Sequence, residues 1–258
     1  MGGNLVELSD AKSVERAARR LFGSALDTRP AVSQSGAVWN DPGSGLLTTL
    51  RIEGHQPKSD LDFLALHMAR ARADAIVITG QILRDEPTLA YDLRTDPRWG
   101  DALVEWRERH WGLWRPPWIL IMTESGRIDF GHPVFKGWGR PMIFTSDRTA
   151  ERKLADSPVP VVADAEPSIR RAIQHLQQSR DAECISIEAG PSTSLELYER
   201  PTVVDELLLS VYLGTSLDVR AQGAPLIELT RLRGRFRTET SSTHRSQHGH
   251  WSFHRFVR

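Results

Sequence analysis

The stretch CISIEAGPS, residues 184–192, joins the pattern of a buried strand to the start of a helix. Its first four residues are mostly apolar, two of them are β-branched, and they are too few for a helix. The small residues Ala189 and Gly190 let a ligand come close to the backbone. Pro191 suits the first position of a helix, which needs no N–H there, and residues 192–198 then supply a short helix. The stretch therefore predicts a strand, a small-residue turn and a helix.

A second apolar strand is predicted at residues 203–213, one helix later. Two strands linked through a helix form an open α/β unit, in which ligands lie beyond the carboxyl ends of the strands. The turn also presents free N–H groups and the positive end of a helix dipole, which together favour an anion. An ordinary strand-to-helix turn is the alternative, and the turn by itself favours it. The neighbouring strand favours the interpretation of the turn as an anion-binding site.

The two strands carry the order I-x-I-E-[AG]-G-P-S and V-D-E-L-x-L. This order resembles the pyrimidine reductase domain of riboflavin biosynthesis, which is usually fused behind a deaminase. The resemblance implies one α/β domain of dihydrofolate-reductase-like topology, with a mostly parallel sheet, helices on both faces and a C-terminal antiparallel hairpin. It also implies NADPH as the cofactor, with its pyrophosphate against the helix that follows a glutamate and two glycines. In this chain those positions are Glu188, Ala189 and Gly190, so alanine replaces the first glycine.

A second small-residue corner follows the buried strand predicted at residues 74–79. The resembled family has Gly-x-Gly-Thr there, beneath the nicotinamide and the diphosphate. In this chain Gln81 replaces the second glycine and Ile82 replaces the threonine, and isoleucine has no hydroxyl for a phosphate. The resemblance assigns the pyrophosphate of the cofactor to Thr79, Gly80, Ala189, Gly190, Pro191 and Ser192. Gln81 and Arg84 are further candidates for cofactor binding.

Two polar residues follow the buried strand predicted at residues 118–122. Ser125 offers a hydroxyl, and Arg127 offers a forked cation that matches the geometry of phosphate. Dihydrofolate-reductase-like folds bring this loop to the adenosine end of the cofactor. The resemblance therefore makes both residues candidates for binding the 2′-phosphate of NADPH. A polar surface turn is the alternative, and the sequence alone favours it.

Two glutamates are candidates for the catalytic, substrate-facing side of the site. Glu53 follows the strand predicted at residues 46–52, where the resembled family carries an acid that faces the substrate. Glu188 follows the strand of the opening stretch. A carboxylate beside a heterocycle can accept ring N–H bonds or relay a proton. For Glu53, a solvated glutamate at a strand end is an equally weighted alternative.

The composition limits the partners of the chain. Its 258 residues contain 33 Lys and Arg and 33 Asp and Glu, so no net field attracts nucleic acid or an anionic membrane. The single cysteine, Cys184, allows no disulfide within the chain, which fits a cytoplasmic location. No apolar run reaches the ~18 residues of a membrane span. The C-terminal histidines lie in strand and turn patterns without a carboxylate cluster, so no metal site is expected.

Residues 1–28 are expected to form a helical extension, with an amphipathic helix at 9–22, and residues 29–258 to form the reductase-like domain. The extension is expected to pack either on this body or on a partner chain. Residues 215–230 have the pattern of a loop. Two alternating stretches then predict the closing antiparallel hairpin, at residues 233–240 and 250–257.

The resemblance as a whole implies an NADPH-dependent reductase of a heterocyclic small-molecule substrate, such as a pyrimidine with a ribosylamino group. It also implies a homodimer. Two alternatives stay open. One is a non-catalytic or divergent member of the fold that binds a ligand or has a structural role, and the other is a reductase of another pathway. Gln81, Ile82 and Ala189 favour the non-catalytic alternative, because they depart from the family pattern.

Overall fold

The computed structural model describes residues 7–51, 55–246 and 249–258. The strands in this part of the chain are β1 (Val32–Asn40), β2 (Leu46–Leu50), β3 (Ala75–Thr79), β4 (Trp118–Met122), β5 (Arg140–Ser146), β6 (Val161–Asp164), β7 (Ile185–Ile187), β8 (Glu206–Tyr212), β9 (Gln222–Glu228), β10 (Thr238–Ser246) and β11 (Gly249–Val257).

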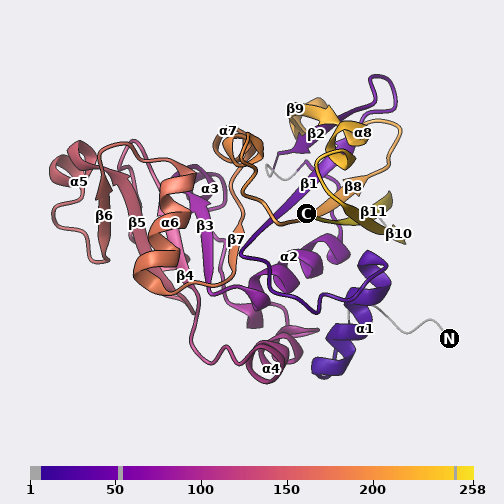
Figure 1. Cartoon of the computed structure of the whole chain (residues 1–258), viewed down its shortest axis with the longest axis horizontal. Helices are drawn as coiled ribbons and strands as arrows, with labels where there is room; N and C mark the ends of the chain where they lie inside the picture. The colour runs from indigo at the N-terminus through magenta and orange to yellow at the C-terminus, as the bar shows by residue number, and fades with distance from the viewer. Residues whose placement is uncertain (1–6, 52–54, 247–248) are drawn as a thin grey trace.

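These strands belong to one sheet in the order β10-β11-β8-β1-β7-β3-β4-β5-β6, with β2 pairing to β1 and to β9 (Figure 1). The strands from β8 to β6 in this order are parallel. Strands β11 and β10 continue the sheet in antiparallel fashion. The predicted mostly parallel sheet with an antiparallel C-terminal hairpin is confirmed.

The α-helices of the described residues are α1 (Ala11–Phe22), α2 (Asp60–Arg72), α3 (Gly80–Asp85), α4 (Gly100–Trp111), α5 (Asp147–Lys153), α6 (Ile169–Arg180), α7 (Pro191–Ser194) and α8 (Leu229–Arg233). Short 3-10 turns are η1 (Leu93–Thr95), η2 (Pro133–Phe135), η3 (Leu195–Tyr198) and η4 (Val219–Ala221). Across residues 7–51, 55–246 and 249–258, every helix is too short or too polar to span a bilayer.

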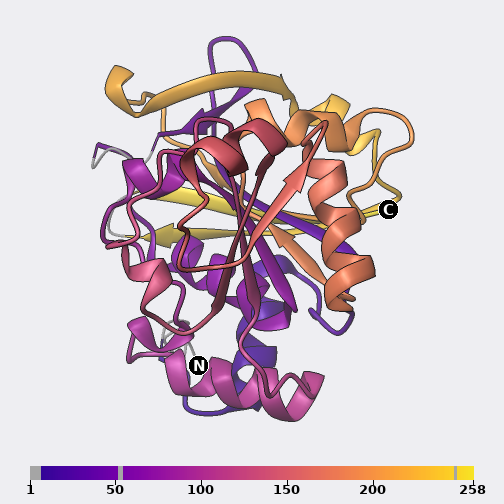
Figure 2. The same ribbon diagram turned by 90° about the vertical axis from the view of Figure 1, so that its left-hand side faces the viewer.

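Apolar clusters cover both faces of the sheet. A single strand contributes to both faces, because its successive residues point to opposite sides. In β3, Ala75 and Val77 belong to the apolar cluster of α6, whereas Ile76 and Ile78 belong to another cluster. Helices α1, α2 and α4 share a third cluster, which covers part of β8 and β11. Figures 1 and 2 both place α1 and α4 at one end of the molecule and β9 at the opposite end.

Helix α1 packs on the body of its own chain. Asp10 caps its start, because the Asp10 side chain accepts a hydrogen bond from the Ser13 N–H at 2.7 Å. Its apolar stripe, which includes Val14 and Phe22, is buried in the cluster shared with α2 and α4. The predicted amphipathic helix is confirmed, and its stripe faces the body.

Two predictions for the C-terminal third are wrong. The loop predicted at residues 215–230 contains β9, which pairs with β2. Gly223 and Pro225 in this strand are residues typical of turns, so the sequence predicts a loop. Proline is nevertheless tolerated in a strand that lies at a sheet edge. The first strand of the hairpin also lies later than residues 233–240, because α8 and a turn precede β10. The second strand is placed as predicted.

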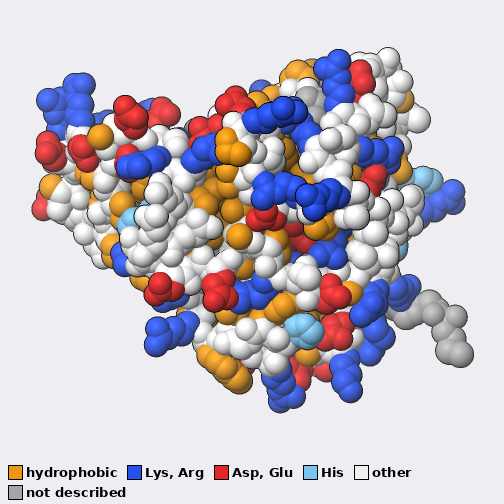
Figure 3. Space-filling view, viewed as in Figure 1, with side chains coloured by type: hydrophobic (Ala, Val, Ile, Leu, Met, Phe, Trp, Pro, Cys, Tyr) orange, Lys and Arg blue, Asp and Glu red, His pale blue; other side chains and the backbone are white. Residues whose placement is uncertain are grey.

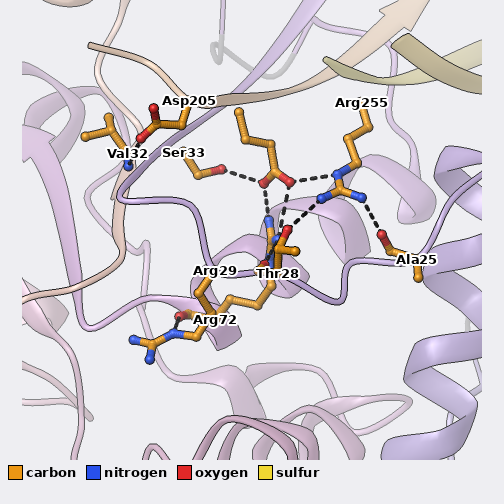
Figure 4. A network of polar contacts seen from close by, with 9 residues as sticks. Ala25, Thr28, Arg29, Val32, Ser33, Arg72, Asp205 and Arg255 are labelled. Atoms are coloured by element: carbon orange, nitrogen blue, oxygen red, sulfur yellow. Dashed lines mark hydrogen bonds and ion pairs between the residues drawn. The ribbon is translucent and has the colours of Figure 1, made fainter. Parts of the chain in front are cut away.

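A buried ion-pair network closes the amino edge of the sheet (Figure 4). Glu206, the first residue of β8, accepts from Arg255 Nε at 2.7 Å, from Ser33 Oγ at 3.0 Å and from both Nη atoms of Arg72. Both arginines also donate to backbone carbonyls between α1 and β1. Burial alone raises the pKa of Glu206, but the two guanidinium groups bring it below its ordinary value. This network ties α2, β1, β8, β11 and the segment between α1 and β1 together.

Candidate functional site

A large cleft opens at the carboxyl edge of the sheet. Its volume is about 1810 Å³, and its walls come from the residues that follow β3, β4 and β7 and from parts of β1, β8 and α2. Ligands of open α/β sheets bind at this edge. Because ligand pockets commonly measure roughly 300–1,000 Å³, the cleft has room for a dinucleotide and a second small molecule. On the face seen in Figure 1, apolar and basic side chains lie side by side over α7 and around it (Figure 3).

The first corner of the cleft is formed where β3 ends and α3 begins. Thr79 caps α3, because its hydroxyl accepts from the Ile82 N–H at 3.4 Å. At Gly80 an added Cβ would lie 3.4 Å from three side chains, so this position is already closely packed. The Ile82 side chain packs with the apolar cluster of β3 and β4. The isoleucine therefore packs against the core and forms part of the cleft wall.

The side chain of Gln81 is exposed and bonded within its own helix. Its Nε2 donates to Asp85 Oδ1 at 2.6 Å, and its Oε1 accepts from Arg84 Nη2 at 2.7 Å. Both contacts lie at the rim of the cleft, which Gln81, Arg84 and Asp85 all line. The glutamine that replaces the family glycine thus fixes the position of a cation beside the cleft.

The second corner follows β7. The Glu188 N–H donates to the Val77 carbonyl at 2.9 Å, which extends the pairing of β7 with β3 by one residue. Ala189 is 6% exposed, and its side chain belongs to the apolar cluster of α6. Gly190 precedes Pro191, the first residue of α7, and a Cβ added to Gly190 would meet nothing within 4 Å. The alanine replacement is therefore accommodated in the core, and the space above Gly190 is open.

The structure brings the two corners together, because β3 and β7 are neighbours in the sheet. Their register pairs Ala75 with Ile185 and Val77 with Ile187, so both strands run to the same edge of the sheet, and β3 extends two residues further, to Thr79. Glu53 lies outside the described residues, so its place in the site is not given. The other candidates from the sequence all line the one cleft: Thr79, Gly80, Gln81, Arg84, Ser125, Arg127, Glu188, Ala189, Gly190, Pro191 and Ser192.

Three cations surround the loop that follows β4. Arg127 is exposed at the rim of the cleft, and its carbonyl accepts from Arg84 Nη1 at 3.2 Å. The Ser125 carbonyl accepts from Lys153 Nζ at 2.7 Å. Gly126 between them has a φ of 63°, a conformation that favours glycine. Ser125 therefore brings a hydroxyl to the cleft, and Arg84 and Arg127 bring positive charges to it, as an anion requires.

A buried ion pair forms part of the cleft wall. Arg70 of α2 donates to both carboxylate oxygens of Glu188, from Nε at 2.8 Å and from Nη2 at 2.7 Å. The side chains are 1% and 7% exposed. The Arg70 guanidinium also lies 4.4 Å from the ring centre of Tyr91. Glu188, a catalytic candidate from the sequence, is thus held in a fixed orientation by two charge-assisted bonds.

Two ionisable residues beside this pair have perturbed pKa values. Burial raises the pKa of Glu86 to about 7, Arg70 opposes this rise, and the negative charges of Glu188 and Asp85 add to it. Burial also raises the pKa of Tyr91 well above its ordinary value. Perturbed groups in a cleft are functional candidates. Neither residue stands out in the sequence, because the pKa values of both depend on burial, which sequence spacing does not report.

A third missed ionisable residue is Asp62, in the first turn of α2. Burial raises the pKa of Asp62, and a hydrogen bond from Ser210 of β8 partly opposes the rise. Asp62, Leu66 and Arg70 all line the cleft, and their i, i+4, i+8 spacing puts them on one face of the helix. That spacing was readable from the sequence, and a mixed acidic and basic stripe on a helix is a usable signal for a polar wall.

No protein-family model and no curated protein matches the sequence of this chain. Similar folds occur among solved structures. The chain aligns with RibD of Acinetobacter baumannii at a TM-score of 0.59 and 14% identity, covering 89% of this chain and 58% of that one. It aligns with a riboflavin biosynthesis reductase of Saccharomyces cerevisiae at 0.54 and 14%, covering 93% and 96% of the two chains.

A third similar structure is a pyrimidine reductase-like protein of Corynebacterium diphtheriae. Its TM-score is 0.60 at 17% identity, and the alignment covers 97% of this chain and 99% of that chain. The chain spans little more than half the length of RibD but nearly the whole of the other two proteins. These likenesses confirm the dihydrofolate-reductase-like fold that the sequence resemblance implied.

Proposed function

We propose that the chain is a reductase that uses NADPH to reduce a heterocyclic small molecule, as in the reductase step of riboflavin biosynthesis. The observation that carries the proposal is the meeting of two backbone corners, near Thr79 and Gly190, in one cleft of about 1810 Å³. The fold that the chain shares with riboflavin-biosynthesis reductases supports the same assignment.

The residues present fit a dinucleotide. The space above Gly190 is open, so a phosphate can approach the backbone there. None of the three replaced family positions closes this space, since Ile82 packs with an apolar cluster, Ala189 is 6% exposed, and Gln81 is hydrogen-bonded within its own helix at the rim. The rim loop presents the Arg127 guanidinium for a 2′-phosphate. These residues would hold the two phosphate-bearing parts of NADPH.

The opposite wall of the cleft suits the substrate. NADPH supplies the hydride when it is bound, and the protein positions the reactants and controls protons. Arg70 fixes the Glu188 carboxylate, so this group can accept a ring N–H in a set direction. Glu86 and Asp62 have raised pKa values, so each can hold a proton beside the substrate. This wall, built from α2 and from the residues that follow β7 and α3, therefore offers both an acceptor and proton donors.

Thermal unfolding with added NADPH tests the proposal directly. A ligand that binds only the folded protein, at a hundred times its dissociation constant, stabilises it by roughly 2.7 kcal/mol. We expect NADPH to raise the Tm and NADH to raise it less. Absence of any shift with either nucleotide would support the non-catalytic alternative. Turnover trials with a riboflavin-pathway pyrimidine and with a folate-like substrate would then separate the two pathways.

The variant Arg127→Ala tests the orientation of the cofactor. Hydrogen bonds to charged groups contribute roughly 1.5–3 kcal/mol, so we expect NADPH affinity to fall at least about tenfold while NADH affinity changes little. Arg148→Ala is the matched control, because Arg148 is exposed on α5 and does not line the cleft. Equal losses for both nucleotides would place the 2′-phosphate elsewhere.

A further inference from the structure

Three polar groups on one wall of the cleft lack partners in the described part of the chain. Arg70 uses Nε and Nη2 for Glu188, but its Nη1 is buried and makes no hydrogen bond. The Tyr91 hydroxyl is likewise buried and unpaired. The Glu86 carboxyl has no hydrogen bond to any described residue, and it lines the cleft with the other two. Because an unpaired buried polar group is costly, such a set indicates a missing ligand.

The chemistry of these groups defines what they can bind. The Arg70 Nη1 only donates, and the tyrosine hydroxyl can donate or accept. A carboxyl that keeps its proton both donates and accepts, so it can form two hydrogen bonds with a ring amide, one to the carbonyl oxygen and one from the N–H. A carboxylate that has lost its proton can only accept.

We propose that Glu86, Tyr91 and the free Nη1 of Arg70 form a recognition subsite for the amide edge of a nitrogen heterocycle. In this subsite the protonated Glu86 carboxyl pairs with the adjacent C=O and N–H of the ring. The Arg70 Nη1 and the Tyr91 hydroxyl donate to a further ring oxygen. This inference rests on the proposed function for the identity of the physiological ligand, but the subsite itself needs no cofactor.

The charges around Glu86 explain why it can keep a proton there. Arg70 and Glu188 form a pair whose charges largely cancel, as their two hydrogen bonds require. Asp85 of α3 adds negative charge, and Tyr91 is neutral because burial raises its pKa. On the side of η2, His132 contacts the Glu86 carbonyl through Nε2 at 3.0 Å. Burial brings the pKa of Glu86 to about 7, while Arg70 opposes the rise and Glu188 and Asp85 add to it.

Uridine and 3-methyluridine are the probes, used with the full chain and no nucleotide cofactor. Uridine carries a ring C=O beside an N–H, and 3-methyluridine has a methyl in place of that hydrogen. We expect uridine to bind at pH 6 and 3-methyluridine to bind at least tenfold more weakly. Between pH 6 and pH 8 the protonated fraction of a group with a pKa of about 7 falls about tenfold, so uridine affinity should fall by about the same factor.

Three variants sharpen the test. Glu86→Gln keeps one acceptor and one donor at every pH, so we expect it to bind uridine with an affinity that no longer changes between pH 6 and pH 8. Tyr91→Phe should weaken binding at both pH values. Glu151→Gln is the control, because Glu151 is exposed on α5 away from the cleft, and it should keep the full tenfold change. Calorimetric titration provides the affinities and also the proton uptake.

Several results would overturn the subsite. These are equal binding of the two nucleosides, a wild-type affinity independent of pH, or loss of uridine binding by a folded Glu86→Gln protein. The wild-type comparison alone decides the matter if a variant does not fold. Binding of uridine as described, without any stabilisation by NADPH, would contradict the proposed reductase and leave the subsite standing. Stabilisation by NADPH without pH-dependent uridine binding would contradict the subsite alone.

Discussion

Two arginines on the same helix, Arg70 and Arg72, each bind a buried glutamate, but in opposite surroundings. Both arginine side chains are 1% exposed. Glu206 at the amino edge of the sheet accepts from two arginines and from Ser33. Glu188 at the carboxyl edge accepts side-chain hydrogen bonds from Arg70 alone among the described residues, and both line the cleft. A buried arginine–glutamate pair thus stabilises the fold at the amino edge, where protein groups surround it. At the carboxyl edge, where the cleft adjoins it, a similar pair forms a binding wall.

The largest effect should come from Glu206→Gln. The substitution keeps the shape of the side chain but leaves two buried guanidinium groups without a counter-charge. Breaking a buried ion pair from one side costs roughly 3–5 kcal/mol, and we expect a loss of that size in the free energy of unfolding by urea. Glu183→Gln is the control: its pair with Arg29 is 3.3 Å long and Glu183 is 82% exposed, so the loss should stay below about 1 kcal/mol. Similar losses of unfolding free energy in Glu206→Gln and Glu183→Gln would show that the buried network around Glu206 stabilises the fold no more than an exposed ion pair does.

Glu188→Gln should cost less, although it also breaks a buried pair held by two hydrogen bonds. Water in the cleft and the nearby Glu86 carboxyl can partly compensate Arg70, so we expect a loss of about 1–3 kcal/mol in urea unfolding. A loss equal to that of Glu206→Gln would mean that Arg70 at the carboxyl edge is as inaccessible to water as the arginines at the amino edge. The same variant should also lower the affinity for uridine, because Arg70 becomes free to reorient.

The sequence was sufficient for the edge of the sheet at which the site lies. Short apolar runs followed by small residues predicted β3 and β7, and their shared edge followed from the rule for open α/β sheets. The sequence was not sufficient for the pairing of Arg70 with Glu188, since these residues are 118 positions apart and meet only through the strand order. Glu86 was not predicted as a site residue for a related reason: its raised pKa comes from burial, which no local sequence pattern records.

The missed strand β9 shows a different limit. Its residues include glycine and proline, which predict a turn wherever their pairing partner is unknown. Pairing with β2 makes it a strand, and that partner lies more than 170 positions earlier in the chain. Patterns within one segment therefore identified the central strands, which are apolar on both faces, and failed at the periphery, where a partner decides.

Glu86→Gln should change how stability depends on pH. In the folded protein Glu86 holds its proton up to a pKa of about 7, whereas the unfolded chain releases it near the ordinary value of 4.5. Folding therefore binds a proton in this window, and stability falls as the pH rises from about 4.5 to 7. Glu86 is partly open to solvent, so the effect is small. As the pH rises from 5 to 8, we expect the free energy of unfolding of the wild type to fall by only about 1 kcal/mol relative to that of the variant.

Urea unfolding at these two pH values is the measurement, and Glu151→Gln is the control that should follow the wild type. The sign is opposite to that of Glu206, whose lowered pKa makes its contribution disappear as the pH falls. A Glu86→Gln protein that loses stability relative to wild type at pH 8 would contradict the raised pKa. The two edges of the sheet are thus distinguished by the direction of their pH response.

The smallest test compares two serines on β1 that point to the same side of the sheet. Ser33 donates to Glu206 at 3.0 Å, whereas the hydroxyl of Ser35, which lines the cleft, is buried without a partner in the described residues. Ser33→Ala should cost about 1–1.5 kcal/mol, because one hydrogen bond is lost while two arginines keep the Glu206 carboxylate bonded. Ser35→Ala should be neutral or slightly stabilising, since it removes an unsatisfied polar atom. Urea unfolding of the two variants measures the difference, and an equal cost at both positions would show that the cleft wall is as fully bonded as the amino edge.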